Sequence, residues 1–262
     1  MSITLQNVVV EYASRGILDG IDLEIEAGEF VSIVGETGCG KSTLLRLILA
    51  EERPTRGRVL VEGRERPRPD RTCGYVPQKY SLFPDKTVLD NMTFGLGFLG
   101  RREFREEALR YLRHTGLTEA DAKKYPHQLS GGMQQRVAIA QALIMKPPVL
   151  LMDEAFSALD PGTRRGMQRL MKDLWRESGT TVVFVTHNTR EAVCLGTRVI
   201  ALAKGERGSS VVLDLDVPHL DFDSGEEEVA RLIARVESAT LTEGPLMARD
   251  GDASPVRMRT PV

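Results

Sequence analysis

The chain has 262 residues, of which 41% are hydrophobic and 27% are charged, and its formal net charge is −2. This length suits one domain of ordinary size with a small appended segment, and the composition excludes disordered and fibrous proteins. A charge balance so near neutrality also argues against nucleic acid as the main partner.

Strand and helix patterns alternate along the chain, which predicts an α/β fold with a mainly parallel sheet. The short apolar or β-branched runs predicted as strands cover residues 8–10, 30–34, 59–61, 149–152, 181–185, 199–202 and 211–217. Helical periodicity covers residues 41–49, 103–114 and 225–237. Several of the strands are apolar throughout, as expected where both faces of a sheet are buried.

Two parts of the chain depart from this alternation. Residues 1–30 and 56–77 are rich in strand signals and predict an antiparallel β subdomain, whereas residues 86–146 contain almost none and predict an inserted helical subdomain. We therefore expect one main domain over residues 1–217. Residues 218–262 are expected to add a short helix and, from 238 onward, a polar mobile tail, with a regulatory role for the tail left open.

The densest basic stretch runs from Arg56 to Arg71, but acidic residues and prolines interrupt it. It is interpreted as a solvated loop in preference to a binding patch. The amino terminus lacks a secretory pattern, and no apolar run approaches the roughly 18 residues that cross a bilayer. Three cysteines, Cys39, Cys73 and Cys194, form no metal or redox spacing, which favours a reducing cytosol.

A glycine-rich loop follows the predicted strand 30–34. Residues 35–43 read Gly-Glu-Thr-Gly-Cys-Gly-Lys-Ser-Thr, which is the spacing of a phosphate-binding loop in its strand–loop–helix setting. Its glycines let backbone N–H groups converge on phosphate oxygens, and the following helix adds the positive end of its dipole. Lys41 is predicted to neutralise the β and γ phosphates of a nucleotide, and Ser42 to bind Mg²⁺. The alternative is a glycine-rich turn with no ligand.

Cys39 lies inside this loop among groups that favour a thiolate. We expect reagents that modify thiols to inhibit the protein, and bound ATP to protect it.

The apolar strand 149–152 ends in two acids, Asp153 and Glu154. Paired carboxylates at the end of a buried strand indicate a nearby cation or reacting group. Asp153 suits a partner of Mg²⁺, and Glu154 suits a general base for the attacking water. The alternative is a strand that emerges into solvent.

The segment Leu129-Ser-Gly-Gly-Met-Gln-Gln-Arg resembles the signature of ABC-transporter ATPases, and the resemblance extends over about residues 3–204. It implies a P-loop NTPase fold, ATP with Mg²⁺ as cofactors, and a homodimer that sandwiches two nucleotides. The catalytic residues that it implies are Glu154, His187, Lys41 and Gln78, and the metal ligands are Ser42, Gln78 and Asp153. The implied nucleotide-binding residues are Tyr12, Gly35, Glu36, Thr37, Gly38, Cys39, Gly40, Lys41, Ser42, Thr43, Ser130, Gly131, Gly132 and Asp160.

Individual roles follow from the same resemblance. Tyr12 is expected to stack on adenine, Gln78 to sense Mg²⁺ and the membrane partner, and His187 to act as a switch at the γ-phosphate. Asp160 corresponds to the loop that crosses the dimer interface. Residues 130–132 open a helix with an expected apolar side, so they form a second anion site or an ordinary serine N-cap.

Three positions depart from the family pattern. Met133 replaces a common glutamine of the signature, Gln141 replaces a common arginine, and Glu36 stands where proline or serine is more common. None removes a group that hydrolysis requires, so we expect two competent sites.

Residues 79–84 and 152–161 resemble importer ATPases of the nitrate, sulfonate, taurine and bicarbonate group. This likeness implies a small nitrogen- or sulfur-containing solute, transmembrane permease subunits, an indirect link to an extracytoplasmic solute-binding protein, and a place at the cytoplasmic face of the inner membrane. Two alternatives stay open: an ATPase of a lipid or lipoprotein extraction or export system, and a non-transport ABC ATPase that acts on DNA or the ribosome.

Overall fold

The computed structural model describes residues 1–13, 15–79, 82–96, 104–218, 220, 222 and 225–241. Residues 80–81 of the 79–84 motif, residue 103 of a predicted helix and residues 242–262 of the predicted tail lie outside these. The chain forms two compact units, one made of Met1–Asp70 with Gly179–Val262 and the other of Arg71–Ser178.

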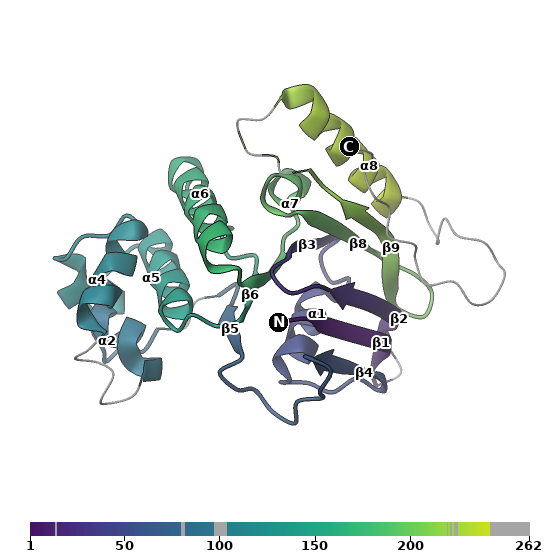
Figure 1. The fold of residues 1–262 in the computed structure, drawn as a ribbon, viewed down its shortest axis with the longest axis horizontal. Coiled ribbons are helices and arrows are strands. Elements are labelled where there is room, and N and C mark those ends of the chain that lie inside the picture. The colour runs from purple at the N-terminus through teal and green to yellow at the C-terminus, as the bar shows by residue number, and fades with distance from the viewer. Residues whose placement is uncertain are drawn as a thin grey trace. The chain divides into compact units, whose positions relative to one another are not determined.

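The first unit contains a mixed sheet in the order β4-β1-β2-β9-β8-β3-β7 (Figure 1). Its strands are β1 (Ile3–Tyr12), β2 (Arg15–Ile25), β3 (Phe30–Gly35), β4 (Arg56–Val61), β7 (Thr181–Val185), β8 (Arg198–Lys204) and β9 (Ser209–Asp216). Strand β3 runs parallel to β7 and β8, and its first five residues are buried. Strand β1 pairs antiparallel with β2 and β4, so the antiparallel part predicted over residues 1–30 is present.

The described residues of this unit include the helices α1 (Lys41–Leu49), α7 (Thr189–Leu195) and α8 (Glu226–Leu241). Helices α7 and α8 bury an apolar cluster against β8 and β9, with Val193, Val199, Leu215 and Leu232 among its members. Helix α8 continues four residues beyond the predicted end at 237. The expectation that the polar tail begins at 238 is therefore wrong for residues 238–241, because Ala239 is buried on the helix.

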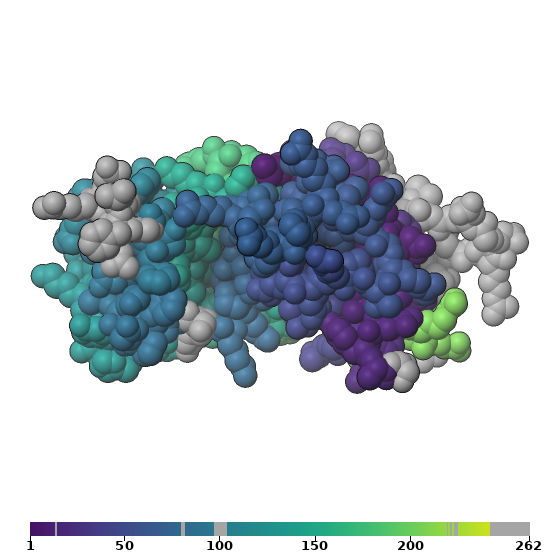
Figure 2. All heavy atoms as spheres, turned by 90° about the horizontal axis from the view of Figure 1, so that it is seen from below, coloured from purple at the N-terminus to yellow at the C-terminus, as the bar shows by residue number. Residues whose placement is uncertain are grey.

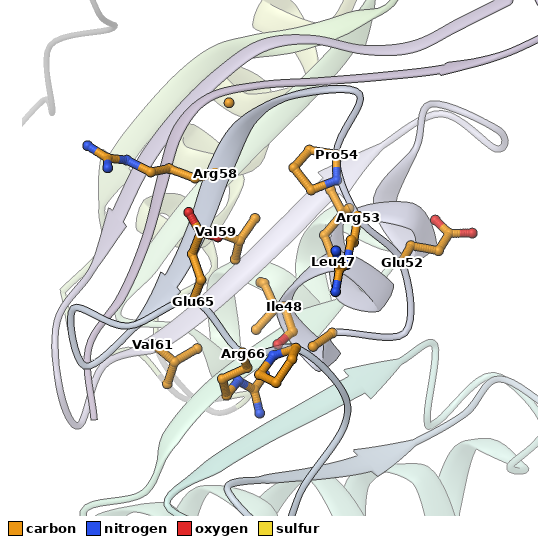
Figure 3. Close-up of a pocket in the computed structure, with 13 residues that line it drawn as sticks. Leu47, Ile48, Glu52, Arg53, Pro54, Arg58, Val59, Val61, Glu65 and Arg66 are labelled. Carbon is orange, nitrogen blue, oxygen red and sulfur yellow. The ribbon is translucent and has the colours of Figure 1, made fainter.

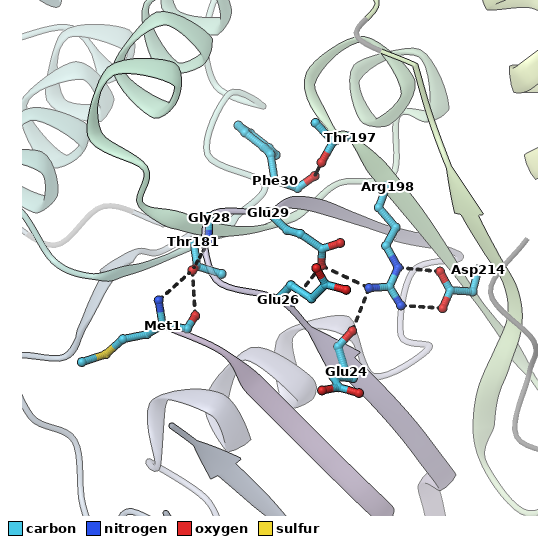
Figure 4. A network of polar contacts seen from close by, with 10 residues as sticks. All are labelled: Met1, Glu24, Glu26, Gly28, Glu29, Phe30, Thr181, Thr197, Arg198 and Asp214. Carbon is cyan, nitrogen blue, oxygen red and sulfur yellow. Dashed lines mark hydrogen bonds and ion pairs between the residues drawn. The ribbon is translucent and has the colours of Figure 1, made fainter. Parts of the chain in front are cut away.

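A buried guanidinium joins four segments of the first unit (Figure 4). Arg198 donates Nε to Asp214 Oδ1 at 2.7 Å and Nη2 to Asp214 Oδ2 at 2.6 Å. Its Nη1 donates to the Glu24 carbonyl at 2.7 Å and to Glu29 Oε2 at 3.1 Å. The group ties β8 to β9 and to the turn that leads into β3, which is the strand that carries the phosphate-binding loop.

Most basic residues of the stretch Arg56–Arg71 are exposed, as the solvated interpretation predicts, but part of the stretch is a strand and one arginine is partly buried. Residues Arg56–Val61 form β4, and the side chain of Arg66 is only 10% exposed because it donates to the Ile48 carbonyl and pairs with Asp70 at 3.1 Å. Figure 3 shows Arg66 beside Ile48 at a hollow of about 360 Å³ between α1 and β4. The blue segment that includes β4 and the residues after it lies at the surface in Figure 2.

The second unit pairs two parallel strands, β5 (Cys73–Val76) and β6 (Val149–Asp153). The prediction that residues 56–77 belong wholly to an antiparallel layer is thus wrong for β5. Helical segments make up most of the rest: α2 (Val88–Thr93), η1 (Phe94–Leu96), α4 (Arg105–His114), η2 (Asp121–Lys123), η3 (Pro126–Gln128), α5 (Gly131–Ile144) and α6 (Pro161–Ser178). Within 86–146, the described residues contain no strand.

Helices α2, α4 and α5 share one apolar core, which contains Met92, Leu112, Val137 and Ile144. Helix α5 is buried on more than the single face that we expected, because Gln135, Ala138 and Ile139 are buried as well as Val137 and Ala140. Its first turn is the exception: Ser130 and Gly131 are exposed.

Candidate functional site

The loop between β3 and α1 has the geometry of a phosphate cradle. Gly40 has φ +90°, and a Cβ on it would lie 2.6 Å from Leu18 Cδ2, so only glycine fits without displacement. Gly40 is also the N-cap of α1, and no side chain caps this helix. The N–H groups of the first turn are therefore left for a ligand, at the positive end of the helix.

Lys41 begins α1 and is 6% exposed. Its Nζ donates to the carbonyls of Gly35 at 2.7 Å and Glu36 at 2.9 Å, and lies 3.9 Å from Cys39 Sγ. Within the described part of the chain it forms no ion pair with a carboxylate. A buried ammonium held only by loop carbonyls and a thiol suits a polyanionic ligand, because burying an unpaired charge costs several kcal/mol, on the order of 3–5.

The remaining loop residues differ in exposure. Glu36, Thr37 and Gly38 are exposed, Ser42 is half-buried, and Thr43 is buried, with its Oγ1 accepting from Arg46 at 3.3 Å. The partial exposure of Ser42 is compatible with its predicted role as a ligand of Mg²⁺.

Cys39 is 1% exposed, and burial raises the pKa of its thiol, an effect larger than the opposing influence of the Lys41 charge. The expectation that its neighbours lower the pKa of Cys39 is therefore wrong, and inhibition by thiol reagents stays a prediction. The sequence places cationic neighbours beside the thiol but does not reveal that Gly35 lies against it and that it is buried.

Tyr12 ends β1 with 44% of its surface exposed. Its hydroxyl donates to Glu52 Oε2 at 2.6 Å, and partial burial together with this carboxylate raises its pKa. The hydrogen bond fixes the ring orientation while a large part of the ring stays available for stacking, as the predicted contact with adenine requires.

His187 lies two residues beyond the end of β7 and is exposed. Ile33 of β3 pairs with Val185 of β7 in a parallel register, so Gly35 and His187 both lie at the carboxyl ends of their strands. Parallel α/β sheets bind ligands at the carboxyl ends of their strands.

Gln78 and Glu154 are in direct contact within the second unit. Val76 of β5 pairs with Met152 of β6, so the residues two positions further along each strand lie side by side. Gln78 Nε2 donates to Glu154 Oε2 at 2.7 Å. Glu154 also has φ +46°, a left-handed backbone that costs a non-glycine residue about 1–3 kcal/mol and that clusters at functional sites.

Asp153, the last residue of β6, is 4% exposed. In the second unit, Gln78 and Asp153 offer an amide oxygen and a carboxylate, and in the first unit Ser42 offers a hydroxyl; each is a hard oxygen donor of the kind that Mg²⁺ prefers. Among the described residues, no group of three or more His, Cys, Asp or Glu side chains converges to hold a metal. The chemistry of each of these donors is compatible with its predicted role in binding Mg²⁺.

The signature segment and Asp160 have helix-capping geometry. Ser130 is the N-cap of α5, with Oγ accepting from the Met133 N–H at 3.3 Å, as the serine-cap interpretation requires. Asp160 precedes α6 and accepts from the Thr163 N–H at 3.1 Å, and hydrogen bonds from Thr163 lower its pKa. Both residues are exposed, so their capping bonds leave them accessible to a partner.

The candidate residues therefore divide into two sets. The first unit holds Tyr12, the loop residues 35–43 and His187, and the second holds Gln78, residues 130–132, Asp153, Glu154 and Asp160. Sequence reasoning missed Glu52 and Lys204, which contact Tyr12 and the loop. No motif contains either residue, and only the pairing of distant strands brings Lys204 to the loop.

Among the described helices, none combines the length and the apolar character that a membrane span needs.

Comparison with known proteins identifies the family of the chain. Residues 18–157 match the family described as ABC transporter. The chain is 41% identical to "Aliphatic sulfonates import ATP-binding protein SsuB 3" of Pseudomonas syringae pv. tomato, over 91% of this chain and 86% of that protein. It is 45% identical to an uncharacterized ABC transporter ATP-binding protein of Methanocaldococcus jannaschii, over 77% of this chain and 76% of that one.

Among solved structures, the chain resembles the ATP-binding cassette MJ0796 in a dimeric post-hydrolysis state bound to ADP and Pi. The TM-score is 0.75 at 37% identity, over 82% of this chain and 99% of that one. This likeness confirms the predicted α/β P-loop fold with parallel and antiparallel strands and added helices.

Proposed function

Because this chain belongs to the ABC transporter family of ATP-binding subunits and is an ATPase of that family, we propose that it powers the uptake of a small sulfur- or nitrogen-containing solute. It would act as a homodimer at the cytoplasmic face of the membrane, attached to permease subunits and served by an extracytoplasmic solute-binding protein. The 41% identity to a protein named for the import of aliphatic sulfonates supports this solute class.

The observation that carries the proposed chemistry is the hydrogen bond from Gln78 to Glu154. A carboxylate at the end of a buried strand, held by an amide and in a strained backbone, suits a general base for the water that attacks the γ-phosphate. Lys41 and the N–H groups of the loop would bind the phosphates, and Ser42, Gln78 and Asp153 would hold Mg²⁺. When bound, the ion supplies charge neutralisation on the β and γ phosphates.

Glu154→Gln provides the test of this assignment. The substitution keeps the shape of the side chain but removes the base, so we expect hydrolysis to fall by at least about 100-fold, the lower range for general-base catalysis. ATP should then accumulate in a dimer. Phosphate release and size-exclusion chromatography with ATP and Mg²⁺ measure both effects. A Glu154→Gln protein that hydrolyses near the wild-type rate would require another base, with His187 the next candidate.

An exposed aromatic pair supports attachment to a membrane partner. Phe83 and Phe94 are 39% and 42% exposed, with ring centroids 4.4 Å apart, and Lys86 Nζ lies over both rings at 5.6 and 5.4 Å. The fully buried Asn91 fixes the segment, because its side chain bonds both the N–H and the carbonyl of Phe83. Phenylalanine is among the residues enriched at protein interfaces. Since Phe83 follows Gln78 closely in the chain, this pair is our candidate contact for the permease.

The solute class needs an assay of the assembled transporter. The subunit, purified with its permease in lipid vesicles, should hydrolyse ATP faster when the binding protein carries an alkanesulfonate than when it is empty. Nitrate, taurine and bicarbonate are the comparison solutes. If none of these solutes stimulates hydrolysis and the assembled transporter extracts or exports lipid, the import proposal is wrong. The assignment of the chain as an ATPase would still hold.

A further inference from the structure

A second lysine lies at the phosphate-binding loop. Lys204 is the last residue of β8, and the pairing of Gly35 with Leu202 carries this strand past the start of the loop. Lys204 Nζ donates to the Thr37 carbonyl at 3.1 Å and lies 4.0 Å from Glu36 Oε2. The side chain is 48% exposed, so it is a surface group that the loop holds in place.

Lys204 forms an ion pair with Glu36, an unusual acid in the phosphate-binding loop. Glu36 is the loop position at which the chain departs from the common proline or serine, and its side chain is 70% exposed. A carboxylate there places a negative charge beside the site that must receive several phosphate charges, and like charges repel. Within the described residues, Lys204 is the one cation that forms an ion pair with Glu36.

The surroundings of Lys204 also favour an anion. Lys204 and Gly38 line a hollow of about 360 Å³, with Arg15 and Ile17 of β2 on its walls. Two cations, Arg15 and Lys204, thus border a space that adjoins the loop, against one acid, Glu206. A charge distribution of this kind raises the local concentration of anionic ligands.

We propose that Lys204 is a positioning residue for the nucleotide: it offsets the charge of Glu36 and holds the Thr37 carbonyl, so that the N–H groups of the loop face the phosphates. This inference rests on the proposed nucleotide site. It adds a residue outside every recognised motif and explains how the loop tolerates an acid at its second position.

The test is a double-mutant cycle in nucleotide affinity. Fluorescent ATP is titrated into wild type, Lys204→Gln, Glu36→Gln and the double variant, each as the full-length chain with Mg²⁺. Lys204→Gln should weaken binding by about fivefold, the upper range for an exposed pair, because the uncompensated acid acts on several phosphate charges. The double variant should return to within about twofold of wild type, since without Glu36 there is no charge to offset.

Matched controls separate this role from others. Arg207→Gln removes the same charge from the same turn, where Arg207 pairs with Asp19 at 3.6 Å and is 88% exposed, and it should leave affinity nearly unchanged. Lys204→Arg should restore binding. The loss of nucleotide affinity in Lys204→Gln should become smaller at high salt, because salt screens charges. The melting temperature of Lys204→Gln without nucleotide should match that of wild type, whereas a merely structural role would lower it.

Lys41→Ala separates a failure of the proposed role of Lys204 from a failure of the proposed nucleotide site. If Lys41→Ala abolishes binding and Lys204→Gln behaves like Arg207→Gln, the inference about Lys204 is wrong and the nucleotide site stands. If Lys41→Ala binds ATP as tightly as wild type, the loop is not the nucleotide site and both fail. Additive effects of Lys204→Gln and Glu36→Gln would also overturn the inference.

Discussion

At the scale of single residues, the Cys39 thiol is enclosed by the loop that it helps to form. Because burial raises its pKa, little thiolate is present near neutral pH, and only the thiolate reacts quickly with alkylating reagents. We expect iodoacetamide to modify native Cys39 slowly, at the rate of local opening, and to modify it fast in denaturant. Peptide mass spectrometry of the time course measures this. Rapid modification of Cys39 in the folded protein, with loss of ATP hydrolysis, would instead show that Cys39 is reactive in the native loop.

The contribution of Asp121 to the stability of the second unit is expected to depend on pH. Its carboxylate accepts from Lys124 Nζ at 2.7 Å and from the N–H and hydroxyl of Thr118, which lower its pKa from 3.8 to about 2. A depressed folded-state pKa adds stability that is complete above the unfolded pKa and is lost as the pH falls towards 2. The stability difference between wild type and Asp121→Asn should therefore be largest at pH 6 and smaller at pH 3, by urea denaturation.

The matching control is Asp173→Asn, which removes an exposed carboxylate from α6 in the same unit. A difference between wild type and Asp121→Asn that stays constant from pH 6 to pH 3 would exclude the proposed link.

The roles of single residues could be predicted from the sequence where the chemistry requires a fixed spacing of residue types along the chain. The phosphate-binding loop and the acids Asp153 and Glu154 follow from short motifs, because the backbone there must curl or end a strand. The contact between Gln78 and Glu154 depends on the register of β5 with β6, and the place of Lys204 on the register of β8 with β3. Register is set by tertiary packing, which one sequence does not display.

At the scale of elements, the Arg198 group fastens β8 and β9 to the turn before β3. Asp214→Asn removes the bidentate partner of the buried Arg198 and leaves Glu29 as its remaining carboxylate, so the free energy of unfolding should fall by about 3 kcal/mol, the lower end for a broken buried pair. Chemical denaturation measures this loss. Asp19→Asn, which breaks the exposed pair with Arg207, should cost less than about 1 kcal/mol. Equal losses in the two variants would contradict the role given to burial.

Elements with strong apolar signals were easier to predict than those without. Strands β3, β6 and β7 are buried along almost their whole length, so their sequences are continuous apolar runs. Helix α6 was not predicted: it carries Gly162 and Gly166 and many charges, and buries only Met167, Gln168, Met171 and Lys172 among its described positions. Gly162 and Gly166 lower the helix propensity of this segment, and its charges leave only a narrow apolar stripe, so its sequence signal is weak.

At the scale of the whole molecule, the aromatic pair offers a test of coupling to a membrane partner. Replacing Phe83 and Phe94 by alanine removes exposed apolar surface, so the ratio of hydrolysis with permease to hydrolysis without it should fall at least about tenfold if the pair is an interface hot spot. Parallel ATPase assays of the isolated and assembled protein give this ratio. A ratio equal to that of wild type would place the contact elsewhere.

The left-handed backbone of Glu154 has a consequence for how this protein can change over time. Glycine would relax that backbone, and it would also remove the carboxylate proposed as the base. On the proposed role of Glu154, selection for thermal stability alone would favour glycine and a more stable but inactive protein, whereas selection for ATP hydrolysis would retain glutamate. An ancestor or laboratory variant with glycine at 154 would be recognised as a binder of ATP that no longer performs work.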